Sequence, residues 1–355
     1  MINMEDHDII KALGEMNFWG RDGIYTGIFL PEYMEKIRKF AGSAVVAVIG
    51  PRRSGKTTIC MQFLEDAIKN GVEKSQTLYV NFEDPLLQPL LADSGGIDAV
   101  YRSYRALVNR SKPAIIVLDE VQNVPGWEKW VRVAHEKYDN IKIIVTGSSS
   151  KLLSSEVSTV LTGRVLAVFV FPLSFRDFMR FRGIETGKEY EMLAKSDKIR
   201  SLLFEYMKYG GFPKVSTEKD RFVKNALLKE YFDGIIFRDI MQRYNIKDIG
   251  LVRNLAELCI NSISSASSAT KMRNILVGVL KRKISPNKVV DSMGYLESSF
   301  LVFFVPAFSR KVKEQKLYPK KNYAVDTGMA NAVTLKFSDD IGKIAENIAF
   351  LQLKR

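Results

Sequence analysis

Two short stretches of the chain carry residue types that bind and cleave phosphate anhydrides. The first, Gly50-Pro-Arg-Arg-Ser-Gly-Lys-Thr57, matches G-x-x-x-x-G-K-[ST] at every fixed position. Its glycines let the backbone curl, so that successive N–H groups point at phosphate oxygens. The pattern places Lys56 to reach the β- and γ-phosphates and the Thr57 hydroxyl to ligate Mg²⁺. The residues predicted to bind ATP are Gly50, Pro51, Arg52, Arg53, Ser54, Gly55, Lys56, Thr57 and Thr58.

The second stretch is a pair of adjacent carboxylates, Asp119 and Glu120, at the end of the apolar run 114–118. Neighbouring side chains of a strand point in different directions, so the two acids should have different roles. We expect Asp119 to help hold Mg²⁺ and Glu120 to polarise the attacking water. The alternative is a strand that ends in acidic surface residues.

Polar residues also end the apolar run Ile141-Lys-Ile-Ile-Val-Thr-Gly-Ser148. The hydroxyls of Thr146 and Ser148 are candidates to position the water or to sense the γ-phosphate, and of the two we select Ser148. A second interpretation stays open, in which Ser148 and the serines after it begin the next helix as an N-cap.

These side chains need a sheet to bring them together. Apolar, β-branched runs predict strands over 44–49, 77–82, 114–120, 141–148 and 165–171. Helices are predicted over 58–69, 97–109, 126–138 and 151–161. This alternation predicts an α/β fold with a parallel sheet, helices on both faces, and the strand 141–148 between the phosphate loop and the acidic strand. An additional strand in the sequence between the two motifs, with the Asp-Glu pair, is typical of P-loop proteins that hydrolyse ATP and argues against a small-molecule kinase.

Further motifs extend the pattern beyond the nucleotide site. They are Leu118-Asp-Glu-Val-Gln-Asn-Val-Pro-Gly-Trp-Glu128, Val145-Thr-Gly-Ser-Ser-Ser150, Leu161-Thr-Gly-Arg164, Phe171-Pro-Leu-Ser-Phe175, Tyr209-Gly-Gly-Phe-Pro213, Phe237-Arg-Asp-Ile240 and Lys321-Asn-Tyr-Ala-Val-Asp-Thr-Gly328. With them, the chain from about Phe18 onward resembles the prokaryotic AAA+ P-loop ATPases, common in archaea, that carry a C-terminal half of unknown function.

The resemblance implies an α/β AAA+-like core, a helical lid, a winged-helix-like module and part of a C-terminal α/β domain related to restriction endonucleases. We place an N-terminal segment at 1–30, the ATPase core at 31–175, the lid or linker at 176–248, the winged-helix-like module at 249–319 and the start of a truncated nuclease-like domain at 320–355. The resemblance also makes Arg164 a candidate sensor or arginine finger, in cis or in trans. A structural pairing of Arg164 with a carboxylate is the alternative. Trp19, just before the core, is expected to pack, with contact to the adenine as its alternative.

The formal charge of the chain is +13, and most of it lies in one region. Residues 271–355 hold 16 Lys and Arg against 7 Asp and Glu, a net charge of +9 that leaves +4 for residues 1–270. A basic module on a near-neutral body suggests a polyanionic partner, and our candidate is double-stranded DNA bound through residues 271–321. A solvated lysine-rich surface is the alternative.

The basic region has the layout of a winged helix–turn–helix. Helices are predicted over 250–261, 269–281 and 286–297, and strands over 300–306 and 316–318. In a DNA-reading version the third helix presents Asn287, Lys288 and Asp291 to a groove, while Lys281-Arg-Lys283 and Arg310-Lys-Val-Lys313 contact phosphates. Because Asp291 suits base reading poorly, two functions stay open. One is ATP hydrolysis coupled to a DNA-associated module, and the other is a nucleotide-dependent switch that binds a protein partner with little turnover and no DNA contact. A second copy of the chain is a further candidate partner.

Composition excludes several other classes of protein. Two cysteines and two histidines exclude a disulfide framework and a multi-histidine metal site. The apolar runs fall short of the ~20 residues of a membrane helix and the N-terminus is acidic, so we expect a cytoplasmic protein without membrane contact. Glu346 matches the first acid of a nuclease fold, but a lone acid cannot support two-metal chemistry, and nuclease activity is not predicted.

Overall fold

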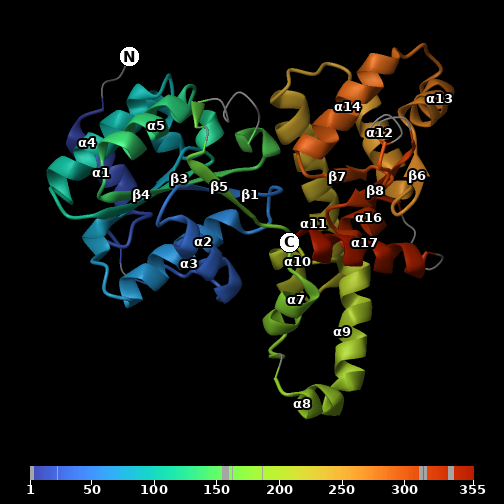
Figure 1. The fold of residues 1–355 in the computed structure, drawn as a ribbon, viewed down its shortest axis with the longest axis horizontal. Helices are drawn as coiled ribbons and strands as arrows, with labels where there is room; N and C mark the ends of the chain where they lie inside the picture. The colour runs from blue at the N-terminus through green and yellow to red at the C-terminus, as the bar shows by residue number, and fades with distance from the viewer. Residues whose placement is uncertain are drawn as a thin grey trace. The chain divides into compact units, whose positions relative to one another are not determined.

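The computed structural model describes residues 4–21, 23–153, 160–161, 163–185, 187–311, 315, 318–334 and 340–355 (Figure 1). The chain folds as two compact units. Unit 1 comprises Met1–Ile49 and Gly55–Val170, and unit 2 comprises Gly50–Ser54 and Phe171–Arg355.

Unit 1 is built on a five-stranded parallel sheet in the order β2-β3-β4-β1-β5. β4 lies between β1 and β3, as predicted, so the strand ends that carry the polar motifs are neighbours. Every residue of β1 and β3 is buried, which explains why both read as unbroken apolar runs. The strands are β1 (Val45–Ile49), β2 (Thr77–Asn81), β3 (Ala114–Asp119), β4 (Ile141–Gly147) and β5 (Val165–Phe169).

Helices cover both faces of this sheet, which confirms the predicted α/β class. α2 and α3 pack together on one side of the sheet, and α1, α4 and α5 pack on the other (Figure 1). The expected helix over 151–161 lies mostly outside the described residues. The helices and 3₁₀ turns are α1 (Asp6–Gly14), α2 (Pro31–Phe40), α3 (Lys56–Lys69), η1 (Lys74–Gln76), η2 (Pro85–Leu90), α4 (Gly95–Leu107), η3 (Val121–Asn123), α5 (Trp127–Lys137) and η4 (Ser150–Leu153).

The open edge of β2 is closed by side chains from the N-terminal segment. Asn17 is 1% exposed; its Nδ2 donates to Tyr79 O at 2.8 Å, and its Oδ1 accepts from Tyr79 N at 2.7 Å. Trp19 Nε1 donates to Thr77 O at 3.0 Å. The two side chains therefore substitute for a neighbouring strand.

We predict that Asn17→Ala lowers the free energy of unfolding of unit 1 by about 2–4 kcal/mol, because it leaves a buried N–H and C=O of Tyr79 without partners. All three tryptophans lie in unit 1, so tryptophan fluorescence during urea unfolding reports on this unit. Asn140→Ala is the control: this exposed asparagine donates to Ser111 O, and its loss should change stability by less than about 0.5 kcal/mol. Equal effects of the two substitutions would contradict the edge-closing role.

Unit 2 is mainly helical. Among the described residues of the chain, no helix is both long enough and apolar enough to cross a membrane. The described helices of unit 2 are α7 (Phe175–Phe181), α8 (Glu189–Ala194), α9 (Ser196–Tyr209), α10 (Pro213–Thr217), α11 (Arg221–Gly234), the π-helix η5 (Ile235–Gln242), α12 (Ile249–Asn261), α13 (Ala269–Leu280), α14 (Pro286–Ser298), α16 (Thr327–Thr334) and α17 (Ile341–Lys354).

A small antiparallel sheet accompanies α12, α13 and α14. Its order is β6-β8-β7, with β6 (Ala266–Ser267) between α12 and α13, and β7 (Val302–Val305) and β8 (Lys320–Ala324) after α14. Of the strand predicted over 316–318, residues 316 and 317 lie outside the described residues and Tyr318 forms a bend, while the partner of β7 is β8. β8 begins with two lysines, which hid its strand character in the sequence.

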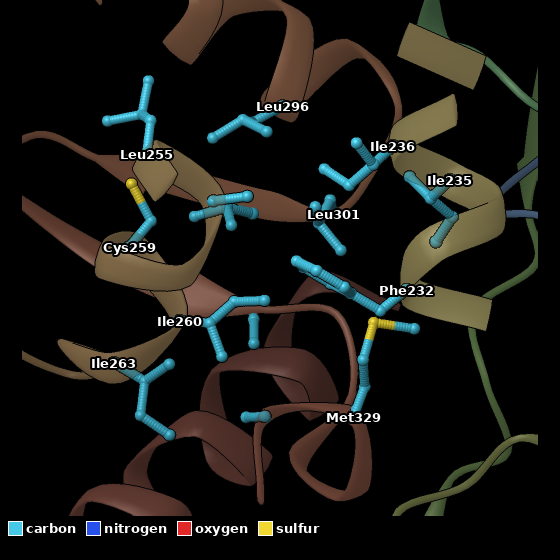
Figure 2. Close-up of a cluster of buried hydrophobic side chains, with 14 of the residues drawn as sticks. Phe232, Ile235, Ile236, Leu255, Cys259, Ile260, Ile263, Leu296, Leu301 and Met329 are labelled. Carbon is cyan, nitrogen blue, oxygen red and sulfur yellow. The ribbon is translucent and has the colours of Figure 1, made fainter. Parts of the chain in front are cut away.

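The core of unit 2 joins helices from both halves of its sequence. Figure 2 shows side chains of α11 and η5 meeting those of α12 and α14, with Met329 of α16 below them. All the labelled side chains are buried: Phe232, Ile235, Ile236, Leu255, Cys259, Ile260, Ile263, Leu296, Leu301 and Met329.

The Tyr-Gly-Gly and Asp-Thr-Gly motifs meet inside unit 2. Asp326 Oδ2 accepts from Gly211 N at 2.7 Å and Oδ1 accepts from Met329 N at 2.8 Å. Burial raises the pKa of Asp326 to about 6. A Cβ on Gly328 would lie 2.0 Å from Tyr209 O, so the close approach requires glycine. The two motifs therefore form a structural junction.

Candidate functional site

The phosphate loop, Gly50–Thr57, turns from β1 into α3 at a glycine. Gly55 has a φ of 100°, a conformation that residues with a side chain rarely adopt. Lys56 is the first residue of α3, whose first-turn N–H groups have no acceptor within the helix. A helix start of this kind attracts anions. The second half of the loop can therefore receive phosphate.

In unit 1 the Asp119 carboxylate is 1% exposed and faces the start of α3. Thr57 Oγ1 donates to Asp119 Oδ2 at 2.7 Å. Tyr79 OH donates to the same oxygen at 2.7 Å, and Thr146 Oγ1 donates to Oδ1. Burial raises the pKa of Asp119, and the hydrogen bonds from Thr146 and Thr57 oppose that rise. The structure thus joins the two residues predicted to hold Mg²⁺.

Glu120 has partners different from those of Asp119. Its φ of 52° is left-handed, so the chain turns sharply after β3. Glu120 Oε1 lies 3.7 Å from Lys56 Nζ, and Glu120 Oε2 accepts from Gln122 Nε2 at 2.5 Å. Lys56 is 4% exposed and Glu120 is 8% exposed. The acidic residues are therefore buried at the site, unlike the surface acids of the alternative interpretation.

Thr146 contacts both residues of the acidic pair. Besides its bond to Asp119, Thr146 Oγ1 accepts from Glu120 N at 3.0 Å. Ser148 follows β4 directly and is fully buried. The structure thus places both hydroxyls at the carboxyl end of β4, and brings Thr146 to Asp119 and Glu120.

Arg164 lies at the opposite ends of the strands from the phosphate loop. It precedes β5, and Val45 N, at the start of β1, donates to Arg164 O at 2.8 Å, whereas the phosphate loop follows the end of β1. Arg164 Nη2 forms an ion pair with Glu136 Oε1 at 2.8 Å. The structure therefore does not bring Arg164 together with Lys56, and an action in trans stays a prediction.

The first half of the loop, Gly50–Ser54, belongs to unit 2. There Arg52 Nε lies 3.3 Å from Oδ2 of the buried Asp239. The Arg53 guanidinium lies over the Tyr231 ring, 5.8 Å from its centroid. Both arginine side chains thus have protein partners, so any phosphate binding by these residues is expected through their backbone.

Two residues of the site were missed by reasoning from the sequence. Tyr79 and Gln122 contact Asp119 and Glu120, respectively. Tyr79 gave a usable signal, because a tyrosine inside a buried strand needs a partner for its hydroxyl. Gln122 gave none, since a polar residue after an acidic strand end usually faces solvent.

The basic residues of unit 2 lie around α13 and α14. Lys281, Lys283 and Lys288 are exposed, and Arg282 forms an ion pair with Asp248 at 2.6 Å. The other residues predicted to contact DNA that are exposed are Asn287, Asp291, Arg310 and Lys311, and Lys313 lies outside the described residues.

Glu346, the predicted first acid of a nuclease fold, is bound within unit 2. Its Oε1 accepts from Lys321 Nζ at 2.8 Å and from Tyr323 OH at 2.7 Å. In the described part of the chain, no three His, Cys, Asp or Glu side chains gather in a way that could hold a metal ion.

Comparisons with known proteins agree with this geometry. A family model described as an AAA domain matches residues 42–179, and one described as a domain of unknown function (DUF8612) matches residues 200–340. The uncharacterized protein MJ1544 of Methanocaldococcus jannaschii is 33% identical over 317 residues, which cover 89% of this chain and 68% of that protein. An uncharacterized protein of Haemophilus influenzae is 28% identical over 330 residues, which cover 91% of this chain and 78% of that protein.

Among solved structures, the Aeropyrum pernix ORC1 protein in complex with DNA is 15% identical and has a TM-score of 0.36. The match covers 91% of this chain and 96% of that chain. The relationship to the M. jannaschii protein, together with the AAA domain match and the phosphate-loop geometry, shows that this chain belongs to a family of AAA+ P-loop proteins with a C-terminal region of unknown function.

Proposed function

We propose that this chain binds ATP with Mg²⁺ and hydrolyses it at residues 50–58, Asp119 and Glu120. The observation that carries the proposal is the 2.7 Å hydrogen bond from Thr57 Oγ1 to Asp119 Oδ2. These residues lie 62 positions apart and meet because β3 ends beside the start of α3. A site that prepares both groups for one metal ion is suited to nucleotide chemistry.

The donor set fits Mg²⁺. A threonine hydroxyl and a carboxylate are hard oxygen donors, and sites of phosphoryl transfer hold Mg²⁺ by one or two such groups together with the substrate phosphates. Thr57 and Asp119 would hold the ion, which when bound neutralises charge on the phosphate oxygens. Lys56 would donate to the β- and γ-phosphates.

Glu120 is the base of the proposed reaction. In the described structure Lys56 forms an ion pair with the Glu120 carboxylate, and Gln122 donates a hydrogen bond to it. Phosphate oxygens compete for Lys56, so bound ATP should draw the ammonium group away from Glu120. Glu120 Oε1 can then accept a proton from the attacking water while Gln122 keeps Oε2 in place.

We further propose that the basic region of unit 2 is a winged-helix-like module that contacts double-stranded DNA and responds to the nucleotide. The order helix, short strand, two helices and a strand pair supports the module. The exposed Lys281, Lys283 and Lys288 support a polyanionic partner, because lysines bind phosphates without reading sequence.

The DNA proposal predicts steep salt dependence. Reversing the charge of Lys283 and Lys288 to Glu should weaken duplex binding at least tenfold and reduce the slope of log affinity against log salt by roughly 2. The control reverses Lys219 and Lys229, two exposed lysines of unit 2 outside the basic region, so that the change in net charge is the same. Fluorescence anisotropy with a labelled duplex at several salt concentrations measures both quantities.

One observation favours a second function, a nucleotide-dependent switch that binds a protein. Three apolar side chains on α13 and α14 are exposed, namely Ile275 at 38%, Val279 at 56% and Val290 at 54%. No duplex binding at low salt, and ATP turnover unchanged by DNA, would favour the switch and contradict the DNA proposal. Faster turnover with duplex DNA would support ATP hydrolysis coupled to DNA.

A further inference from the structure

The Asp119 carboxylate is oriented by hydroxyl groups from three different elements. Thr57 of α3 and Tyr79 of β2 each donate to Oδ2 at 2.7 Å, and Thr146 of β4 donates to Oδ1. Asp119 is 1% exposed, so water contributes little to holding it. The rotation of this carboxylate therefore depends on these three side chains.

Tyr79 is held rigidly on the face of the sheet that carries Asp119. Asn81 is registered opposite Asp119, and Tyr79 precedes Asn81 by two residues, so strand alternation puts Tyr79 and Asp119 on one face. The tyrosine is 1% exposed, and its backbone N–H and C=O are both bonded to the Asn17 side chain. Its hydroxyl is thus delivered to Asp119 from a fixed position.

Any buried tyrosine needs a hydrogen-bond partner for its hydroxyl, and Tyr104 provides a comparison with Tyr79. Tyr104 is fully buried in unit 1, and its OH donates to a backbone carbonyl, Ser75 O, at 2.7 Å. Tyr79 donates at the same distance to a carboxylate that also faces Thr57. The hydrogen bond of Tyr104 therefore only satisfies its hydroxyl, whereas that of Tyr79 also orients the Asp119 carboxylate.

We propose that Tyr79 is a positioning residue of the magnesium site, which holds the Asp119 carboxylate with Oδ2 turned toward Thr57. The inference rests on the proposed Mg²⁺–ATP site. Side chains that hydrogen-bond a metal-ligating carboxylate typically contribute ~10–100-fold to metal affinity, because they fix the ligand before the ion arrives. Tyr79 thereby extends the site to the edge strand, outside both sequence motifs.

Tyr79→Phe tests this role, because it removes only the hydroxyl and keeps the ring in the core. Calorimetry with a non-hydrolysable ATP analogue measures binding first in EDTA and then during a titration with Mg²⁺. We expect Tyr79→Phe to bind the analogue in EDTA as wild type does, and to need ~10-fold more Mg²⁺ for the metal-dependent gain in affinity. Tyr104→Phe, the matched control, should follow wild type in both measurements.

Each other outcome counts against the inference. A Mg²⁺ requirement for Tyr79→Phe within about twofold of wild type, or equal to that of Tyr104→Phe, overturns it. Loss of binding in EDTA means that Tyr79 supports the fold and has no particular role toward the metal. A wild-type protein that gains no affinity from Mg²⁺ overturns both the inference and the proposed site. If wild type gains affinity and Tyr79→Phe matches it, the inference alone fails.

Discussion

Glu120→Gln is expected to bind ATP as tightly as wild type and to hydrolyse it ~10²–10⁴-fold more slowly. Glutamine keeps the shape of the side chain but cannot accept a proton from water. It also keeps an oxygen that can accept from Gln122 Nε2, so the loop after β3 should hold its conformation. The two quantities to compare are the dissociation constant of ATP, from calorimetry, and the rate of phosphate release.

The control for this substitution is Glu73→Gln. Glu73 is an exposed carboxylate of unit 1 that pairs with Lys112 at 2.5 Å, on the approach to β2. Its substitution removes one negative charge without touching the site, so turnover should stay at the wild-type value. Unchanged hydrolysis by Glu120→Gln would show that Glu120 is not the base, and loss of ATP binding would show a structural role.

Lys56→Met is expected to weaken ATP binding by at least ~30-fold, because it removes a buried charge that in the proposed site pairs with the phosphates. Methionine retains the apolar part of the side chain, which is 4% exposed, and so limits the loss of packing. The dissociation constant of a fluorescent ATP analogue measures the effect.

Lys69→Met is the matched control, because it changes a lysine at the other end of the same helix. Lys69 is exposed and pairs with Glu65 at 2.6 Å. Its substitution should leave ATP affinity within about twofold of wild type, since exposed ion pairs contribute little. Equal losses for the two variants would mean that general charge, and not the phosphate loop, attracts the nucleotide.

The central strands β1, β3 and β4 of unit 1 could be predicted because they are largely buried on both faces. Such strands read as apolar runs, and β1, β3 and β4 were found within one residue of their ends. The phosphate loop was equally visible, because its left-handed turn favours glycine at position 55. Local constraints of this kind leave a signature in adjacent residues.

The contacts around the two acids could not be predicted in the same way. Tyr79 and Thr146 reach Asp119 across strands β2 and β4, and only the register of the sheet brings them there. Between Thr146 and Ser148 the sequence offered two hydroxyls at one strand end. The register places Thr146 one position beyond the pair Leu118–Val145, beside Asp119, and so brings its hydroxyl to the acid.

Unit 2 shows a second limit of sequence patterns. The helices α12, α13 and α14 were predicted to within one residue, because each has an apolar face that packs in one core. β8 was not predicted because its apolar residues come only in its second half, and its first residues are lysines. The π-helix η5 follows α11 without a break, and no cap or proline marks the change.

The central claim is that Asp119, Glu120 and the phosphate loop form a Mg²⁺-dependent ATP hydrolysis site. The most direct measurement follows γ-labelled phosphate during incubation of the purified wild-type chain with ATP, in Mg²⁺ and in EDTA. We predict label released as inorganic phosphate in Mg²⁺ and release near background in EDTA. No Mg²⁺-dependent release from ATP that calorimetry shows to be bound, or transfer of the label to an acceptor other than water, would contradict the claim.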